Sequence, residues 1–343
     1  MRIAIVGAGV SGLVAAHALA RVHDVTLFEA NDYAGGHSNT VRVETDAGAW
    51  DVDTGFIVHN DRNYPGFRRL LDSLGVATQA SDMSFGVADP VGDFEYTGAS
   101  ANGLYAKRSH LVTPWFQRMV ADLVRFNREA RALLGEGGGP HAGPSLRAWL
   151  DERRYSRAFV ERLIVPQASA VWSADPQQLW SFPARFLVQF FDNHGMLGFR
   201  DRPRWRTVVG GSRRYVDAIV QRLGERRVRL SSPVRAIARH AGHVELAFAT
   251  RAEPERFDHV VVAAHGDQAL RMLADPSERE RELLGAFPYQ SNDVTLHTDR
   301  GLLPRRRRAW ASWNYHLLDR EPGRPTVTYH MNRLQALAAD REL

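Results

Sequence analysis

The sequence predicts an α/β fold in which a parallel sheet is interrupted by a mainly helical α+β insertion. Three observations predict it. A strand, a glycine turn, a helix and a second strand occupy the first 29 residues, further strands follow residue 205, and helical patterns lie between the two groups. Continuous apolar runs are typical of buried parallel strands, whereas spacings of three and four residues indicate amphipathic helices.

The N-terminal elements are the clearest. Residues 2–6 form a short apolar run that ends at Gly7, and residues 24–28 form a second run that ends at Glu29. Residues 10–20 between them are rich in alanine and leucine, which favours a helix. This order predicts a compact βαβ unit.

The middle of the chain carries mostly helical patterns. Residues 50–55 look extended, and the expected helices cover residues 67–74, 113–134, 146–150 and 157–165. A Gly/Pro-rich break at 135–144 predicts a surface loop. The second α/β stretch has an expected helix at 214–223 and strands at 228–230, 234–240, 244–249 and 258–264.

The glycine turn has the GxGxxG pattern of dinucleotide-binding loops. Gly7 permits a tight turn, Gly9 permits close approach of a pyrophosphate, and Gly12 permits close helix–strand packing. Glu29 ends the second strand, where a carboxylate accepts hydrogen bonds from ribose hydroxyls. The pattern predicts a nucleotide contact set of Gly7, Ala8, Gly9, Val10, Ser11, Gly12, Glu29 and Ala30.

A second glycine pair follows directly. The segment from Tyr33 to Thr40 resembles the R-x-G-G-R-x-x-[ST] motif of glutathione-reductase-like flavoproteins, in particular the amine-oxidase superfamily. Gly35, Gly36 and Thr40 match the motif, whereas Tyr33 and His37 stand where it has arginine. The resemblance implies FAD as the cofactor and a Rossmann-type FAD-binding domain.

Three weaker motifs extend the resemblance along the chain, at residues 52–56, 208–211 and 232–237. In the superfamily the first lies close to the flavin, and a valine in the third contacts the adenine side. The resemblance adds to the cofactor contact set Gly35, Gly36, His37, Thr40, Asp53, Thr54, Gly55, Phe56 and Val234.

The predicted organisation is discontinuous. Residues 1–55 and 205–272 form the FAD/NAD(P)-binding domain, and residues 56–204 and 273–343 form the substrate or cap domain. The superfamily usually closes with a C-terminal segment that contacts the ribityl chain and pyrophosphate. This segment is not found before Leu343, so we expect it to be missing, which leaves retention of FAD open.

A narrower resemblance concerns residues 53–65, 82–85 and 310–315. They look like a bacterial subgroup of predicted NAD/FAD-binding proteins associated with cyclopropane-fatty-acid-synthase-like enzymes. The resemblance implies an apolar or lipid-like substrate and a methyltransferase-type partner enzyme.

The implied reaction is hydride transfer from a substrate C–H bond to flavin N5, which the cofactor itself supports. Many amine oxidases of the superfamily place a lysine near N5, and this chain has only Lys107. We therefore expect a dehydrogenase or desaturase rather than an amine oxidase. The alternatives are an amine oxidase, an NAD-dependent dehydrogenase, a non-redox flavin isomerase and a non-catalytic nucleotide-binding partner of a lipid-modifying enzyme.

Candidate substrate-site residues are polar or aromatic side chains beside these motifs. The weak catalytic candidates are His59, Tyr64, Trp313 and Tyr315, and further lining candidates are Asn60, Asn314 and His316. Each is also compatible with ordinary core packing or a structural hydrogen bond.

Composition excludes other classes of function. The chain has no cysteine, its histidine spacings predict no metal site, and its arginines are spread rather than concentrated in a nucleic-acid-binding motif. The arginine run at 305–308 is a solvated loop or a peripheral contact with anionic lipid headgroups. No segment is long and apolar enough to span a bilayer, and we expect a cytoplasmic protein.

Overall fold

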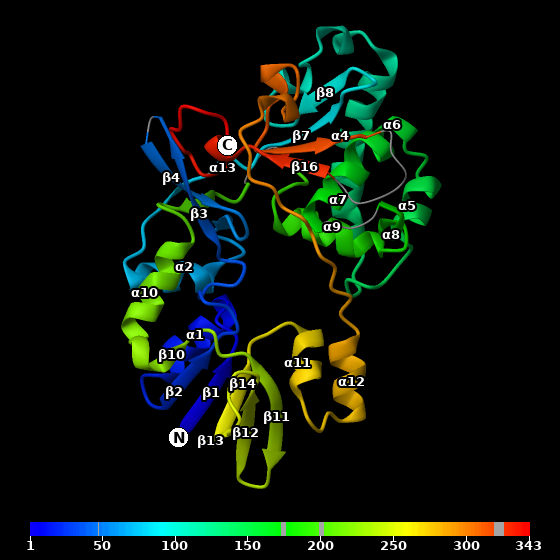
Figure 1. The fold of residues 1–343 in the computed structure, drawn as a ribbon. Coiled ribbons are helices and arrows are strands. Elements are labelled where there is room, and N and C mark those ends of the chain that lie inside the picture. The colour runs from blue at the N-terminus through cyan, green and yellow to red at the C-terminus, as the bar shows by residue number, and fades with distance from the viewer. Residues whose placement is uncertain (47, 173–175, 199–201, 319–325) are drawn as a thin grey trace.

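The computed structural model describes residues 1–46, 48–172, 176–198, 202–318 and 326–343. Figure 1 shows an elongated molecule. The sheet that contains the N-terminus lies at one end, and a second sheet packed against helices lies at the other. Among the described residues no helix is both long and apolar enough to cross a membrane.

A parallel sheet forms the N-terminal end, with strand order β10-β2-β1-β14. Its strands are β1 (Arg2–Val6), β2 (Asp24–Phe28), β10 (Val228–Arg229) and β14 (His259–Val262), and α1 (Val10–Leu19) connects β1 to β2. All three pairings are parallel. The predicted strand–helix–strand unit is therefore present, and the strand predicted at 258–264 lies beside β1.

Two apolar cores cover the faces of this sheet because successive side chains of a strand point to opposite sides. Ile3 and Ile5 of β1 join a core with α1, α2 (Pro65–Leu74) and α10 (Arg213–Leu223). Ala4 and Val6 join the other core, which packs against β11 (Val234–His240), β12 (His243–Phe248) and β13 (Glu255–Phe257). These last three strands form an antiparallel sheet.

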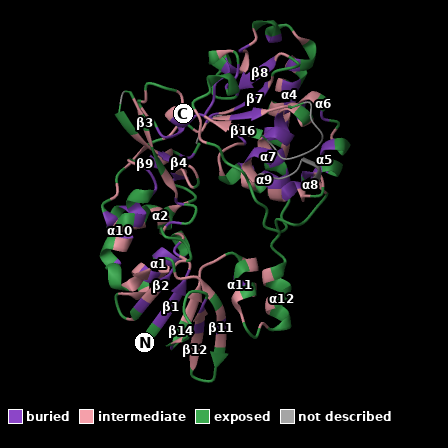
Figure 2. Ribbon diagram, viewed as in Figure 1, coloured by how far each residue is buried: buried purple, intermediate pink, exposed green. Residues whose placement is uncertain are grey.

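The sheet at the opposite end has the order β16-β15-β7-β8. It consists of β7 (Phe85–Asp89), β8 (Phe94–Thr97), β15 (Trp313–His316) and β16 (Thr326–Tyr329), and β15 runs parallel to β7. Its apolar residues and the adjoining helices share a large core, which is the buried region around β7, α4 and α9 in Figure 2. The principal helices are α4 (Pro114–Gly135), α5 (Leu146–Glu152), α7 (Val165–Trp172) and α9 (Ala184–Asn193).

Short strands connect the two ends. A hairpin of β3 (Thr40–Thr45) and β4 (Gly48–Asp53) lies near a small sheet of order β5-β9-β6. The small sheet consists of β5 (Val58–Asn60), β6 (Thr78–Ala80) and β9 (Trp205–Val208). The remaining helices are α3 (Ala101–Leu104), α6 (Arg157–Phe159), α8 (Pro176–Leu179), α11 (Gly266–Met272), α12 (Glu278–Gly285) and α13 (Met331–Leu334).

The insertion is richer in strands than its sequence pattern indicates, because β5 to β8 all fall in the stretch from 56 to 204. These strands have only three to five residues, too few for an apolar period to be recognised. The expected helices at 67–74, 113–134 and 146–150 correspond to α2, α4 and α5.

Candidate cofactor site

The candidate cofactor site lies where the carboxyl ends of three parallel strands meet. Gly7 follows β1, Glu29 follows β2, and Ala263 follows β14. The Gly7 N–H donates to the Phe28 carbonyl at 2.8 Å, and the Ala263 N–H donates to the Val6 carbonyl at 2.8 Å. Ligands of open α/β sheets bind outside this edge.

The glycines of the first motif have different surroundings. A Cβ atom at Gly12 would lie 1.8 Å from the Gly7 carbonyl oxygen, so this position requires glycine for helix–strand packing. A Cβ at Gly9 would meet no atom within 4 Å. No side chain caps the N-terminus of α1 at Gly9, and free N–H groups at a helix start attract phosphate.

Glu29 links the glycine turn to the loop that follows β2. Its Oε2 accepts a hydrogen bond from the Ala8 N–H at 2.8 Å, and its Oε1 accepts one from the Asn31 N–H at 3.0 Å. Each carboxylate oxygen has a second lone pair, so ribose hydroxyls can still donate to it.

The second glycine pair lies against the first motif. The Gly35 N–H donates to the Ala8 carbonyl at 2.8 Å, and Gly9 and Gly35 form a parallel β-bridge. A Cβ at Gly36 would lie 3.2 Å from the Gly9 Cα, so the two loops approach closely. The structure therefore brings together the two glycine motifs that the sequence places 23 to 29 residues apart.

His37 occupies the position where the resembled motif has arginine. Its ring stacks on His265 at 5.7 Å between centroids, and His265 stacks on Tyr289 at 4.4 Å. His265 immediately precedes α11, and the Gly266 N–H donates to the Tyr289 hydroxyl at 2.9 Å. This row of rings forms one border of the site, and no sequence motif pointed to His265 or Tyr289.

The segment from Thr54 to Phe56 runs beside the segment from His37 to Asn39. The Phe56 N–H donates to the His37 carbonyl at 2.7 Å, and the Thr54 N–H donates to the Asn39 carbonyl at 2.9 Å. A Cβ at Gly55 would lie 2.1 Å from the His37 carbonyl oxygen. Glycine at this position allows the two predicted contact segments to pack together.

Asp53 lies in a buried polar cluster. Its Oδ1 accepts hydrogen bonds from the Thr40 hydroxyl at 2.6 Å and from the N–H and hydroxyl of Ser212 at 2.8 Å each. Gln335 donates to Oδ2 at 3.1 Å and accepts the Asp53 N–H at 2.7 Å. Burial raises the pKa of Asp53, although the hydrogen bonds from Thr40 and Ser212 oppose this. The carboxylate thus joins β4 to the start of α10.

Val234 begins β11 and packs in the core that also contains Phe28. The loop before it is held to Glu29, because the Ser232 N–H donates to the Glu29 carbonyl at 2.7 Å. The loop before Val234 is therefore attached to the predicted ribose acid, and contact of Val234 with adenine stays a prediction.

His59 and Asn60 of β5 are buried, and their side-chain nitrogens have no hydrogen-bond partner among the described residues. The exposed fraction is 1% for His59 and 0% for Asn60. Neither ring nitrogen of His59, nor the Asn60 Nδ2, has a hydrogen-bond partner among the described residues. Burial, together with the charges of Arg206 and Arg68, lowers the pKa of His59 to about 4. Unpaired buried polar groups are uncommon, and an absent ligand is one cause of them.

One aromatic ring contacts His59, and further rings extend from it. Phe67 of α2 lies 5.3 Å from the His59 ring and 5.4 Å from Phe56, and Tyr64 lies 6.1 Å from Phe56. Burial raises the pKa of Tyr64, so its hydroxyl stays protonated at neutral pH. Phe67 also contacts Tyr215 of α10, whose hydroxyl hydrogen-bonds Ser38. This aromatic group connects β5 to the cofactor loops.

The candidates on β15 have mainly structural contacts. Asn314 is fully buried, and its side chain accepts from the Ala311 N–H at 3.0 Å and donates to the Ala311 carbonyl at 2.7 Å. Tyr315 lies in the large helical core, and His316 pairs with the Thr328 hydroxyl at 2.8 Å. Trp313 packs on Tyr329 at 4.8 Å.

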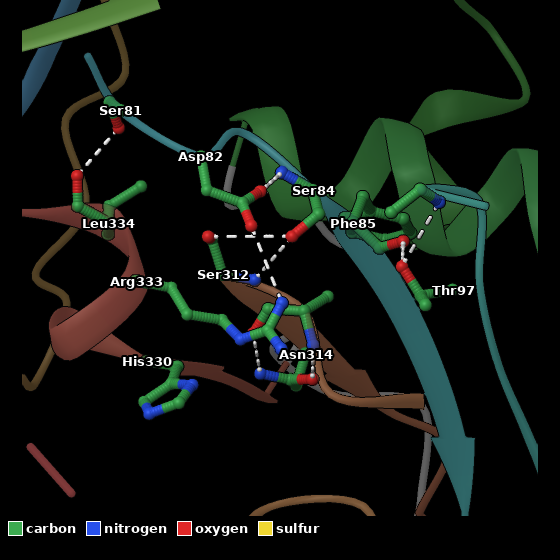
Figure 3. Close-up of polar contacts among 12 residues, drawn as sticks. Ser81, Asp82, Ser84, Phe85, Thr97, Ser312, Asn314, His330, Arg333 and Leu334 are labelled. Carbon is green, nitrogen blue, oxygen red and sulfur yellow. Dashed lines mark hydrogen bonds and ion pairs between the residues drawn. The ribbon is translucent and has the colours of Figure 1, made fainter. Parts of the chain in front are cut away.

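Two motifs of the narrower resemblance meet at this point. The Ser312 N–H donates to Ser84 Oγ at 2.9 Å (Figure 3). The Trp313 N–H donates to the Ser84 carbonyl at 3.0 Å. Asp82 accepts the Ser84 N–H and pairs with Arg333 of α13 at 3.4 Å. Segments 82–85 and 310–315 are therefore partners in one sheet. Trp313 and Val58, which directly precedes His59, both pack against the apolar cluster that contains Val52 and Met331.

A basic hollow of about 520 Å³ lies beside β5 and the start of α2. It is lined by Asp61, Arg62, Arg68, Arg202, Pro203 and Arg204. The described lining residues include one aspartate and four arginines, and this balance of charge favours an anion. It lies where the chain leaves β5 and where it returns towards β9, close to the boundary expected between the two domains.

Lys107 and the arginine run lie away from this edge. Lys107 forms an ion pair with Asp93 at 2.8 Å, near β8. In the run at 305–308, Arg306 pairs with Asp93 at 2.7 Å and Glu95 at 3.3 Å, and Arg307 lies over the Trp310 ring. Arg306 is thus anchored to the β7–β8 region, while contact of the run with lipid headgroups stays a prediction.

A family model and several solved structures are similar to this chain. The family model of flavin-containing amine oxidoreductases matches residues 10–326. No curated protein matches the chain significantly in sequence. Among solved structures, cyclohexylamine oxidase from Brevibacterium oxydans IH-35A is 24% identical with a TM-score of 0.62, and the match covers 83% of this chain and 62% of that one.

Two further structures show the range of relatives. A putrescine oxidase bound to putrescine is 20% identical with a TM-score of 0.67, over 100% of this chain and 74% of that one. A fatty acid isomerase from P. acnes is 18% identical with a TM-score of 0.57, over 83% of this chain and 63% of that one. The chain is therefore shorter than these proteins, and it shares their fold.

Proposed function

The chain belongs to the family of flavin-containing amine oxidoreductases, and from this premise we propose that it is an FAD-dependent oxidoreductase acting on a C–H bond of an apolar substrate with an anionic end. The observation that carries the cofactor assignment is the open space at Gly9 beside the uncapped start of α1. The observation that carries the substrate class is the arginine-lined hollow beside β5.

The residues present fit FAD. The backbone N–H groups at the start of α1 and the paired loops at Gly9 and Gly36 would hold the pyrophosphate, and Glu29 would accept the ribose hydroxyls. His37 and His265 would border the phosphates in place of arginine, and Val234 would lie against the adenine. Thr54 to Phe56 continue from this cradle towards His59.

When bound, FAD supplies a hydride acceptor at N5, so the protein needs no dedicated acid–base pair. The contribution of this chain is to bind and orient the substrate. The unpartnered nitrogens of His59 and the Asn60 amide can each form a hydrogen bond to a bound group. His59 is neutral at pH 7, and the Phe67 ring lies against it.

The charges favour an anionic substrate over an amine. A protonated amine would be repelled by the arginines of the hollow, whereas a carboxylate or phosphate would be attracted. Lys107 is bound to Asp93 near β8, so this chain does not offer a lysine beside the flavin. We propose dehydrogenation or desaturation of a fatty-acyl or similar lipid-like molecule. Association with a methyltransferase-type enzyme is part of the same proposal and rests on the sequence resemblance alone.

The first experiment tests the cofactor. Purified protein is examined for flavin absorbance bands, and its melting temperature is followed with added FAD or NAD. Flavin bands, or an upward shift with FAD and none with NAD, support the proposal. A shift with NAD alone would instead favour an NAD-dependent dehydrogenase, and indifference to both nucleotides would favour a non-catalytic chain.

The second experiment tests the substrate class. Flavin bleaching under anaerobic conditions is measured with a long-chain fatty acid, its methyl ester and a primary alkylamine of equal length. We expect the acid to reduce the flavin best, with KM about tenfold higher in Arg68→Ala or Arg204→Ala and unchanged in the exposed-site control Arg226→Ala. Faster bleaching by the amine would make the chain an amine oxidase. Conversion of the acid without bleaching would indicate a flavin isomerase.

A further inference from the structure

The β11–β12 hairpin carries a cluster of metal-ligating side chains away from the nucleotide site. His240 and His243 lie directly opposite each other at the end of the hairpin and are joined by Ala241 and Gly242. Glu245 lies two residues beyond His243 and therefore points to the same face of β12. The turn brings all three side chains together, although their spacing along the sequence does not predict a metal site.

The geometry of the cluster is compact. The two imidazole rings stack with centroids 4.6 Å apart and planes inclined by 16°. His240 Nε2 lies 3.5 Å from Glu245 Oε2, and His243 Nε2 lies 3.2 Å from Glu245 Oε1. One ligand atom from each residue lies within 4.8 Å of the other two.

We propose that His240, His243 and Glu245 bind one divalent transition-metal ion of the Zn²⁺ type. Two imidazole nitrogens and one carboxylate oxygen are a ligand set that Zn²⁺, Ni²⁺ and Cu²⁺ accept. Metal–ligand bonds of about 2.0–2.2 Å need the three atoms about 3.3 Å apart. The separations between the histidine nitrogens and the carboxylate are already close to this, and the half-exposed side chains can adjust by rotation.

The surroundings are compatible with an ion but weaken its binding. Arg256 of β13 is paired with Glu245 across the sheet and shares its face, so it places a positive charge near the carboxylate. Arg239 lies on the other face, where it binds Asp275 and Glu280. With three protein ligands, the remaining coordination positions would be filled by water. The ion would clamp the turn end of the hairpin, at the far end of β11 from Val234.

The test is titration of the full-length chain with Zn²⁺ by isothermal calorimetry at pH 7.5. We expect one ion per chain, and at least a tenfold loss of affinity in His240→Ala and in His243→Ala. His141→Ala is the control, because His141 is an exposed histidine outside the hairpin.

A second variant separates loss of a ligand from loss of folding. Arg256→Gln removes the neighbouring charge and keeps the ligands, so we expect Zn²⁺ to bind a few-fold more tightly. Absence of Zn²⁺ binding in the wild-type chain, or affinity unchanged by both histidine variants, would overturn the proposal. The titration needs no FAD, so its outcome is independent of the proposed function.

Discussion

Gly9 and Gly12 belong to one motif but differ in what a methyl group would meet. At Gly9 the space is open and φ is −68°, a value that alanine also adopts. At Gly12 a methyl group would collide with the Gly7 carbonyl oxygen at 1.8 Å. The protein therefore requires glycine at position 12 for its own packing, whereas the open side of Gly9 is available to a ligand.

This difference gives a matched pair of variants. We expect Gly9→Ala to keep the wild-type free energy of unfolding and to weaken FAD binding by about tenfold, because the methyl group occupies space next to the pyrophosphate. Gly12→Ala should instead destabilise the fold by about 3 kcal/mol through overpacking. Urea unfolding and fluorescence titration with FAD measure the two effects. Normal FAD affinity in Gly9→Ala would argue against the assigned pyrophosphate position.

His59 makes stability depend on pH. Its pKa is about 4 in the folded chain and about 6.5 when unfolded, so the unfolded state binds the proton more readily between these values. The stabilisation is complete above pH 6.5 and is lost as the pH falls towards 4, by about 3 kcal/mol in total. We expect His59→Asn to reduce the slope of unfolding free energy against pH in this window. His141→Asn should retain the wild-type slope, and an equal change in both variants would contradict the assignment.

At the scale of elements, the cluster around Asp53 joins parts of the chain that are distant in sequence. Asp53 ends β4, Ser212 directly precedes α10, and Gln335 directly follows α13. Each buried hydrogen bond contributes little by itself, but an unpaired buried partner is costly. The cluster thus fixes the hairpin that begins at Thr40 relative to the rest of the cofactor loops.

Removal of one side chain from the cluster around Asp53 should lower the stability of the fold. Gln335→Ala deletes the partners of both the Asp53 N–H and Oδ2, and we expect a loss of about 1–3 kcal/mol in the free energy of unfolding. Gln221→Ala on the exposed face of α10 is the control and should change stability by less than about 0.5 kcal/mol. Equal changes in the free energy of unfolding of the two variants would show that the hydrogen bonds between Gln335 and Asp53 contribute no more to stability than an exposed side chain does.

At the scale of the molecule, the apolar cores are separate. The cores on the two faces of the parallel sheet adjoin the cofactor loops, whereas the large helical core belongs to the opposite end. A ligand stabilises the parts that it orders, and hydrogen exchange reports this locally. The two ends should therefore respond differently to FAD.

We expect FAD to slow amide exchange at residues 7–13, 29–37, 53–56 and 263–266, and to leave α4 and α9 unchanged. Mass-spectrometric hydrogen exchange with and without FAD measures this, with NAD as the control ligand. Protection confined to α4 and α9 would contradict the assignment of the nucleotide site to the end of the molecule that contains the N-terminal sheet.

The features that the sequence predicted are local ones. The order from β1 through α1 to β2 follows from apolar runs and a glycine motif within 29 residues, and the second glycine pair is close enough to be placed beside the first. Helices α2, α4 and α10 were predicted because each repeats its apolar face over two turns or more.

The features that escaped prediction depend on distant contacts. β15 pairs with β7 across more than 200 residues, so the resemblance of Asn314 to a site motif did not reveal its role as a buried structural amide. Gln335 reaches Asp53 across 282 residues without any local signal. His265 has no motif of its own in the sequence, since the only recognisable pattern there is the apolar strand that precedes it. The unsatisfied nitrogens of His59 are a property of burial, which its short strand does not disclose.

The contacts of Ala8 have a kinetic consequence. Its N–H is held by the Glu29 carboxylate and its carbonyl by the Gly35 N–H, so hydrogen bonds within the chain hold the two glycine loops together. A preorganised site loses little conformational entropy on binding, and association is then a single docking step without a slow ordering phase. Differences in affinity among variants of these loops should consequently arise in the rate at which the nucleotide leaves.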